Sequence, residues 1–466
     1  MNRHLLFLVL IVLAACSKDE KKSPSVFFAG EIVNPTNRYV VLYKGDVVID
    51  SAQLDDANRF VIQLDSVSEG LHHFNTSREF QYLFLENGDS VQVRLNTIDF
   101  DESLVFSGTT SSSEINNFLL DLFLSNEEEE RAIFKNGYEL EPNDFAIYVD
   151  SLRLQKLDDL DRLTSESDLS EGAKEIARAS IDYTYFRYKE EYLFEHRKHE
   201  GLKVIQHLPN GFYDYRKGIS FDKGHLNYLR PYYDFMQAHF KNLSYSNCSK
   251  YCEIKNDVVR NPLHFNRHKL SLIDSLVQEK ELKDNLFRNV AINYLLMSRD
   301  SEKNIESFIE DFRSRSPNNR HSKEINDLFT GIQNMQPQKK VPDLMVTAIN
   351  GDSASLQEIS KDKKVVFYFW TAANRAHFEN VVKRAKQLSD IKKDYDFVGI
   401  NIRTDDATWK GMVEAAGLDK QNQYKADDFN EIQRILIIDK LNKCIIAEDA
   451  IIVDAFSDMY ATSLIN

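Results

Sequence analysis

The chain has 466 residues and a formal net charge of −15 at pH 7. This acidic balance leaves no basic surplus to neutralise phosphates, which argues against nucleic acid as a partner. The hydrophobic fraction of 42% is ample for packed cores, and the length predicts two to four domains.

Residues 1–16 have the pattern of an export signal. A short polar segment precedes an apolar run of 11 residues, which is too short to span a membrane. The run ends in Leu-Ala-Ala-Cys, which resembles the lipobox of bacterial lipoproteins, and this resemblance implies acylation of Cys16, for example by palmitate. The alternative is a plain secretory signal with an incidental cysteine. We expect residues 17–24 to tether an outer-membrane lipoprotein that faces the periplasm or the cell surface.

Residues 25–110 predict an antiparallel β-sandwich or barrel. Short strand-like segments such as VFFAGEI, RYVVLYKG and SVQVRLN are separated by turn signals such as Asn34-Pro35 and Asn87-Gly88. Strands at this spacing, with residues alternating between apolar and polar, are typical of small all-β domains.

Residues 111–335 predict a helical domain, because apolar residues recur with a period near 3.6. Ile115, Leu119 and Leu122 lie on one face of the first predicted helix. The four consecutive glutamates at 127–130 are expected to form a solvated loop.

The helical region also contains the candidate cysteine and histidine sites. Cys248 and Cys252 have the spacing C-x3-C, which outside the cytoplasm predicts a small disulfide, with free thiols and a redox function as the alternatives. His264 and His268 have a spacing that suits a metal ion, but no third ligand is evident, so we expect surface histidines, no metal and no cofactor. Cys444, on a predicted strand, is expected to be a buried free thiol.

Residues 336–466 predict a third domain, of α/β type. The apolar run at 365–370 indicates a buried central strand, and a helical pattern follows it. A second central strand is predicted at 397–402. Residues 435–439 (ILIID) and 444–447 predict the two strands of a closing hairpin, and the tail at 454–466 is expected to be a helix.

This order of elements resembles the thioredoxin-like domain of the TlpA-like thiol–disulfide oxidoreductase family. The run FLENGDSVQV likewise resembles the β domain that often precedes such domains in lipoproteins. In the family a Trp-Cys-x-x-Cys turn opens the first helix, and a cis-proline precedes a strand that ends in Leu-Ile-Asp. The five motif positions are occupied here by Ala373, Asn374, Arg375, Ala376 and His377, and Gln433 stands about where the proline would be.

The resemblance therefore implies the fold but not the activity, because thiol–disulfide exchange needs a thiolate and a second thiol. We expect a redox-inactive envelope protein that acts as a binding or scaffold module for a protein, peptide or ligand. The positions of Asn374 and His377 are either a residual site for an anion or peptide or an unused site filled by polar residues. Two alternatives are an oxidoreductase that uses Cys248 and Cys252, and a structural component of an envelope complex.

Overall fold

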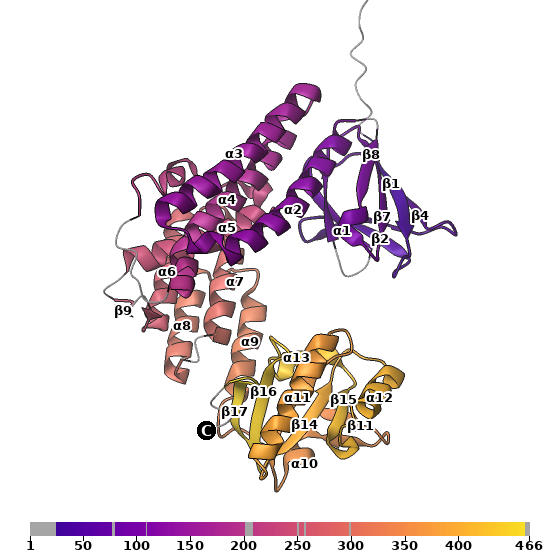
Figure 1. The fold of residues 1–466 in the computed structure, drawn as a ribbon, viewed down its shortest axis with the longest axis vertical. Coiled ribbons are helices and arrows are strands. Elements are labelled where there is room, and N and C mark those ends of the chain that lie inside the picture. Colours follow the sequence, from indigo (N-terminus) through magenta and orange to yellow (C-terminus); the bar gives the residue numbers. More distant parts are fainter. Residues whose placement is uncertain are drawn as a thin grey trace, which may run out of the picture. The chain divides into compact units, whose positions relative to one another are not determined.

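A computed structural model describes residues 25–76, 80–108, 110–200, 208–248, 251–255, 258–297 and 300–461 (Figure 1). The predicted signal, its Cys16 and the tether lie outside the described residues. The chain divides into two compact units, Met1–His239 and Phe240–Asn466, and each is considered by itself. Within the described ranges, no helix combines the length and apolar character needed to cross a membrane.

The N-terminal region, indigo in Figure 1, has two four-stranded sheets among its described residues, and they share one hydrophobic core. In this core the ring of Phe28 lies 5.1 Å from the rings of both Phe60 and Phe74. β1 and β7 pair in parallel, so the sandwich is mixed rather than wholly antiparallel. Alternation predicts the buried face of a strand but not its direction. The sheet orders are β4-β1-β7-β8 and β3-β2-β5-β6, with β1 Val26–Val33, β2 Tyr39–Lys44, β3 Val47–Gln53, β4 Arg59–Leu64, β5 Gly70–Asn75, β6 Phe80–Leu85, β7 Ser90–Asn96 and β8 Val105–Gly108; α1 is Phe100–Ser103.

Helix α2 (Ser112–Lys135) bonds to one edge strand of each sheet. The Asn116 side chain accepts from Phe84 N at 2.7 Å and donates to Phe84 O at 3.0 Å, on β6. Asn117 makes the same two bonds with Phe106 on β8, at 2.9 and 2.8 Å. An uncovered edge presents unpaired backbone groups to other chains. The two asparagines therefore replace part of a missing neighbouring strand.

The remaining helices of the first unit enclose an aromatic core, in which the ring of Tyr192 lies 4.4 Å from that of Phe145. The expectation of a solvated loop at 127–130 is wrong, because these glutamates lie within α2. Glu129 pairs with Lys156 of α3 at 3.1 Å, and Glu130 pairs with Arg187 of α4 at 2.6 Å. These elements are η1 Gly137–Glu139, α3 Pro142–Glu166, α4 Glu171–Glu200, η2 Asp214–Gly218, η3 Gly224–Leu226 and the first part of α5 (Arg230–Asn247), whose residues from Phe240 on belong to the second unit.

The second unit contains further helices that lead into the C-terminal sheet. The ring of Tyr294 on α7 lies 4.3 Å from that of Phe308 on α8. Gly331 on α9 lies against Ile437, since an added Cβ would meet Ile437 Cδ1 at 2.6 Å. Helix α9 therefore packs directly on the C-terminal domain. The elements are β9 Ile254–Lys255, β10 Val258–Val259, α6 Pro262–Leu276, α7 Lys280–Met297, α8 Glu302–Arg315 and α9 Ser322–Asn334.

The C-terminal sheet, orange to yellow in Figure 1, has the topology expected of a thioredoxin-like fold. β13 is parallel to β14 and antiparallel to β16, which forms a hairpin with β17. Trp370 of β13 packs with Phe378 of α11 and Trp409 of α12 in one core. The strand order is β12-β11-β15-β14-β13-β16-β17, with β11 Met345–Ala348, β12 Ser353–Ser355, β13 Lys364–Trp370, β14 Asp396–Asn401, β15 Gln423–Ala426, β16 Lys443–Glu448 and β17 Ile451–Asp458; the helices are α10 Leu356–Ser360, α11 Arg375–Ile391, α12 Asp406–Ala415, η4 Lys420–Asn422 and α13 Phe429–Ile435.

The fold class is confirmed: β sheets, then helices, then an α/β domain with a thioredoxin-like sheet. In the C-terminal domain, two local predictions are wrong. Residues 435–439 are the end of α13 and a turn, in which Ile437 has a φ of 52°, rather than a strand. Residues 454–458, expected to be helical, belong to β17. A short apolar run is consistent with either a buried strand or a buried helix end, so periodicity alone does not decide between them.

Candidate functional site

Three loops at one edge of the C-terminal sheet form a continuous surface. The parallel strands β13, β14 and β15 end at this edge, and the loops lead into α11, α12 and α13. Ala372 N donates to Thr404 Oγ1 at 3.0 Å, and the Arg403 guanidinium lies 3.6 Å from the centre of the Phe429 ring. We call residues 371–377, 402–405 and 427–429 the loop surface. Ligands of open α/β sheets generally bind at the carboxyl ends of the strands.

The motif residues 373–377 lie on this loop surface, at the start of α11. Asn374 is the N-cap of α11, and its Oδ1 accepts from His377 N at 3.0 Å. His377 Nε2 lies 3.0 Å from Phe369 O at the end of β13. Because a carbonyl oxygen only accepts, Nε2 carries the proton. Both side chains are thus held by the backbone, with Asn374 exposed and His377 half-buried.

Gln433 does not have the position predicted for it. It lies inside α13, and its Nε2 donates to Ile438 O at 3.2 Å. The strand next to β13 is β16, which begins at Lys443, so Asn442 is the residue that precedes it. No peptide bond in the described ranges is cis. The prediction failed because the apolar run at 435–438 was interpreted as the strand.

Cys248, Cys252, His264 and His268 come together in the second unit. His264 Nδ1 lies 3.4 Å from Cys248 Sγ and 3.5 Å from Cys252 Sγ. Cys248, Cys252 and His268 offer ligand atoms that all lie within 4.8 Å of one another. Both cysteines are free thiols, so the predicted disulfide is not present in this structure. The sequence shows both spacings, but only the fold shows that the two pairs meet.

The described cysteines are all buried, which makes them poor exchange nucleophiles. Cys252 is 0% exposed, and burial together with the neighbouring Cys248 thiol raises the pKa of Cys252 to about 12. Cys444 is also 0% exposed and faces Tyr368 across β13 and β16, as expected for a buried free thiol.

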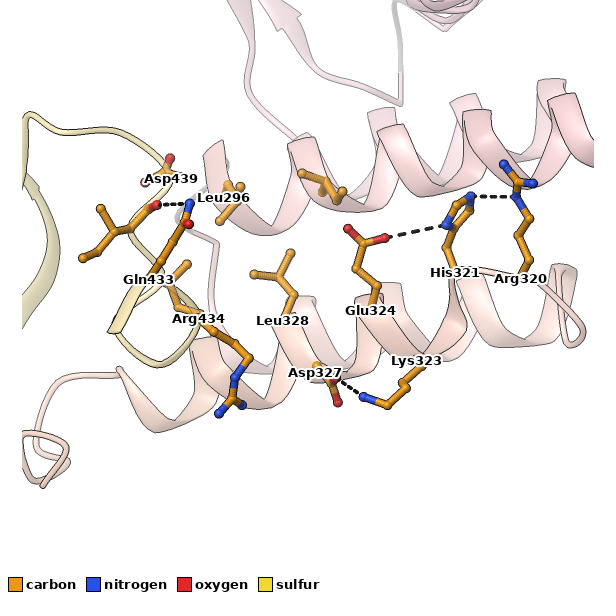
Figure 2. A pocket seen from close by; sticks show the side chains of 13 residues that line it. Leu296, Arg320, His321, Lys323, Glu324, Asp327, Leu328, Gln433, Arg434 and Asp439 are labelled. Carbon is orange, nitrogen blue, oxygen red and sulfur yellow. Dashed lines mark hydrogen bonds and ion pairs between the residues drawn. The ribbon is translucent and has the colours of Figure 1, made fainter. Parts of the chain in front are cut away.

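A pocket of about 640 Å³ lies between α7, α9 and the turn after α13 (Figure 2). Figure 2 shows that several charged side chains along α9 are paired, among them Lys323 with Asp327 at 2.6 Å. Glu324, also in the lining, pairs with Arg288 at 2.5 Å. The charges of Lys323, Asp327 and Glu324 are therefore compensated by neighbouring side chains.

No family model matches the chain, and no curated protein matches it significantly. Parts of it are similar to solved structures. The thioredoxin domain of a thiol-disulfide oxidoreductase from Bacteroides vulgatus is 18% identical, with a TM-score of 0.24, over 28% of this chain and 92% of that one. A thiol:disulfide interchange protein from Bacteroides sp. is 19% identical, with a TM-score of 0.22, over 26% and 80%. A thioredoxin-like protein from Bacteroides caccae is 14% identical, with a TM-score of 0.33, over 53% and 87%. None of these likenesses assigns a role to a residue of this chain.

Proposed function

We propose that this chain is a redox-inactive, thioredoxin-like lipoprotein of the bacterial envelope that binds a protein, peptide or ligand through the loop surface. The start of α11 carries the proposal. Exchange needs two thiols there, one to attack and one to resolve the mixed disulfide. Asn374 and His377 stand where the resemblance implies those thiols, and their bonds to the backbone of α11 and β13 stabilise the helix start without supplying a thiolate.

The loop surface has features that suit a peptide segment. Ala373 and Ala376 are exposed and small, so a partner backbone can approach α11 closely. Arg403 is exposed and lies over Phe429, and it offers guanidinium donors to carbonyl or carboxylate groups. The contacts between the three loops hold these groups in place before a partner arrives, which lowers the entropy cost of binding.

A disulfide-exchange assay tests the loss of redox function. The chain from Ser17 onward is compared with Cys248→Ser/Cys252→Ser and with Asn374→Cys/His377→Cys, which restores two thiols at the start of α11. We expect no catalysed reduction of insulin by the wild-type chain and measurable catalysis by the restored variant. Wild-type turnover that Cys248→Ser/Cys252→Ser lacks would contradict the proposal and place the chemistry in the helical region.

Site-specific crosslinking in cells tests binding at the loop surface. A photo-crosslinking residue is placed at Ala376, and the matched control is Gln387, which is exposed farther along the same helix. We expect a discrete adduct at Ala376 that is absent at Gln387. Identical adducts at both positions, or none at Ala376, would argue against this surface as the binding site.

A further inference from the structure

The two cysteines and two histidines of the second unit follow one pattern along the chain. Cys248, Cys252, His264 and His268 have the spacing C-x3-C-x11-H-x3-H. Paired cysteines followed by paired histidines at similar spacings are typical of structural zinc sites. Both histidines lie in the first half of α6 (Pro262–Leu276), and residues four apart share one face of a helix.

Backbone hydrogen bonds fold the loop that connects the two pairs back on itself. Asn261 N donates to Cys252 O, and Arg260 N donates to Glu253 O, each at 3.2 Å. Asn261 then caps α6, because its Oδ1 accepts from His264 N at 3.0 Å. These contacts bring the start of α6 next to Cys252, so the four side chains are gathered by the backbone itself.

The distances from His264 to the two sulfurs suit a tetrahedral ion. Zn–S bonds of about 2.3 Å and Zn–N bonds of about 2.05 Å place sulfur and nitrogen about 3.6 Å apart in a tetrahedron. The two distances from His264 Nδ1 to the sulfurs are 3.4 and 3.5 Å. A neutral imidazole nitrogen has a single lone pair and can accept only one hydrogen bond. The closeness of both thiols to this one nitrogen is therefore not explained by hydrogen bonds that they donate to it.

Ser244 holds His268 in a suitable tautomer. The Ser244 hydroxyl, which is 0% exposed, donates its one proton to Phe265 O at 3.1 Å. It therefore accepts from His268 Nδ1, which lies 3.3 Å away. The proton then resides on Nδ1, and Nε2 has a lone pair for a metal. Metal-binding histidines commonly donate their other ring nitrogen to such a partner.

We propose that Cys248, Cys252, His264 and His268 bind one Zn²⁺ ion in a closed, structural site. A set of two sulfurs and two nitrogens suits zinc rather than Ca²⁺ or Mg²⁺, which prefer oxygen ligands. Binding releases the two thiol protons to solvent and leaves two thiolate ligands. Four protein ligands leave no open position for substrate, so the ion fastens the end of α5 to α6 and stabilises this part of the fold.

Metal analysis of the chain from Ser17 onward, purified without chelator, tests the site. We expect one zinc per chain by mass spectrometry, and less than a tenth of that in Cys252→Ser and in His264→Asn. The controls are Cys444→Ala and His225→Gln, which change a buried thiol and a histidine elsewhere and keep full zinc content. Wild-type protein without zinc that also fails to bind added Zn²⁺ after reduction of its thiols would overturn the proposal.

Cobalt substitution gives a test that does not depend on a variant folding. The reduced wild-type chain, titrated with Co²⁺, is expected to show the thiolate charge-transfer and intense d–d bands of a tetrahedral site, saturating at one equivalent. Ser244→Ala should retain these bands but weaken affinity about 10- to 100-fold, as observed for lost partners of metal-binding histidines. Octahedral spectra would contradict the assignment. Protein that carries a Cys248–Cys252 disulfide, and that binds no metal after this disulfide is reduced, would contradict it as well.

Discussion

At the scale of single residues, His72 shows how burial controls protonation. Its side chain is 2% exposed, and its Nδ1 lies 2.9 Å from Gly70 O. Burial, and then the charge of Lys44, lower the pKa of His72 to about 4. An unfolded histidine has a pKa near 6.5, so between about pH 6.5 and pH 4 the unfolded state binds more protons than the folded state.

Stability is therefore expected to fall on acidification through this window, by up to about 3 kcal/mol from His72. Urea unfolding of the first unit, followed at pH 7, 5.5 and 4, measures the loss. In His72→Gln the amide still donates to Gly70 O but does not titrate, so the slope against pH should be smaller. An unchanged slope in this variant would show that His72 does not control the pH dependence.

At the scale of elements, α2 is a helix that bonds to an edge strand of each sheet of the sandwich. Asn116 is 1% exposed and satisfies both backbone groups of Phe84. Asn116→Ala would leave a buried donor and a buried acceptor without a partner, each costing about 1–3 kcal/mol. We expect the free energy of unfolding to fall by about 2–4 kcal/mol, measured from urea midpoints. The control is Asp121→Ala, which changes an exposed residue of the same helix. If both substitutions lowered the free energy of unfolding by the same small amount, this role of Asn116 would be refuted.

At the same scale, two segments show that local sequence patterns were not sufficient to predict the structure. The glutamates at 127–130 have the composition of a solvated loop, yet they pair with α3 and α4 because those helices supply Lys156 and Arg187. Residues 435–438 are as apolar as a buried strand, yet they end a helix, and Lys443 Nζ donates to Leu436 O and Ile437 O, both at 2.7 Å. In the first case partners distant in sequence determined the outcome, and in the second a lysine six and seven residues farther along the chain bonds to the turn.

At the scale of the whole molecule, we propose that membrane attachment depends on acylation of Cys16. Several acyl chains hold a protein firmly, whereas a single chain binds weakly. We expect Cys16→Ala, expressed in a Gram-negative host, to lose radiolabelled palmitate and to move from the membrane fraction to the soluble fraction. A Ser17→Ala variant, which keeps the cysteine, should remain in the membrane fraction. Retention of Cys16→Ala in the membrane would exclude the lipid as the anchor.

The fold class and the start of α11 could be predicted from the sequence because both depend on local patterns. A continuous apolar run predicted β13, and the residues at 373–377 include no cysteine. Only the tertiary structure decided three other features. These are the bonds of α2 to two sheet edges, the place of β16 next to β13, and the meeting of Cys248 and Cys252 with His264. Such contacts join residues far apart in the chain, and periodicity carries information only about neighbours within a few residues.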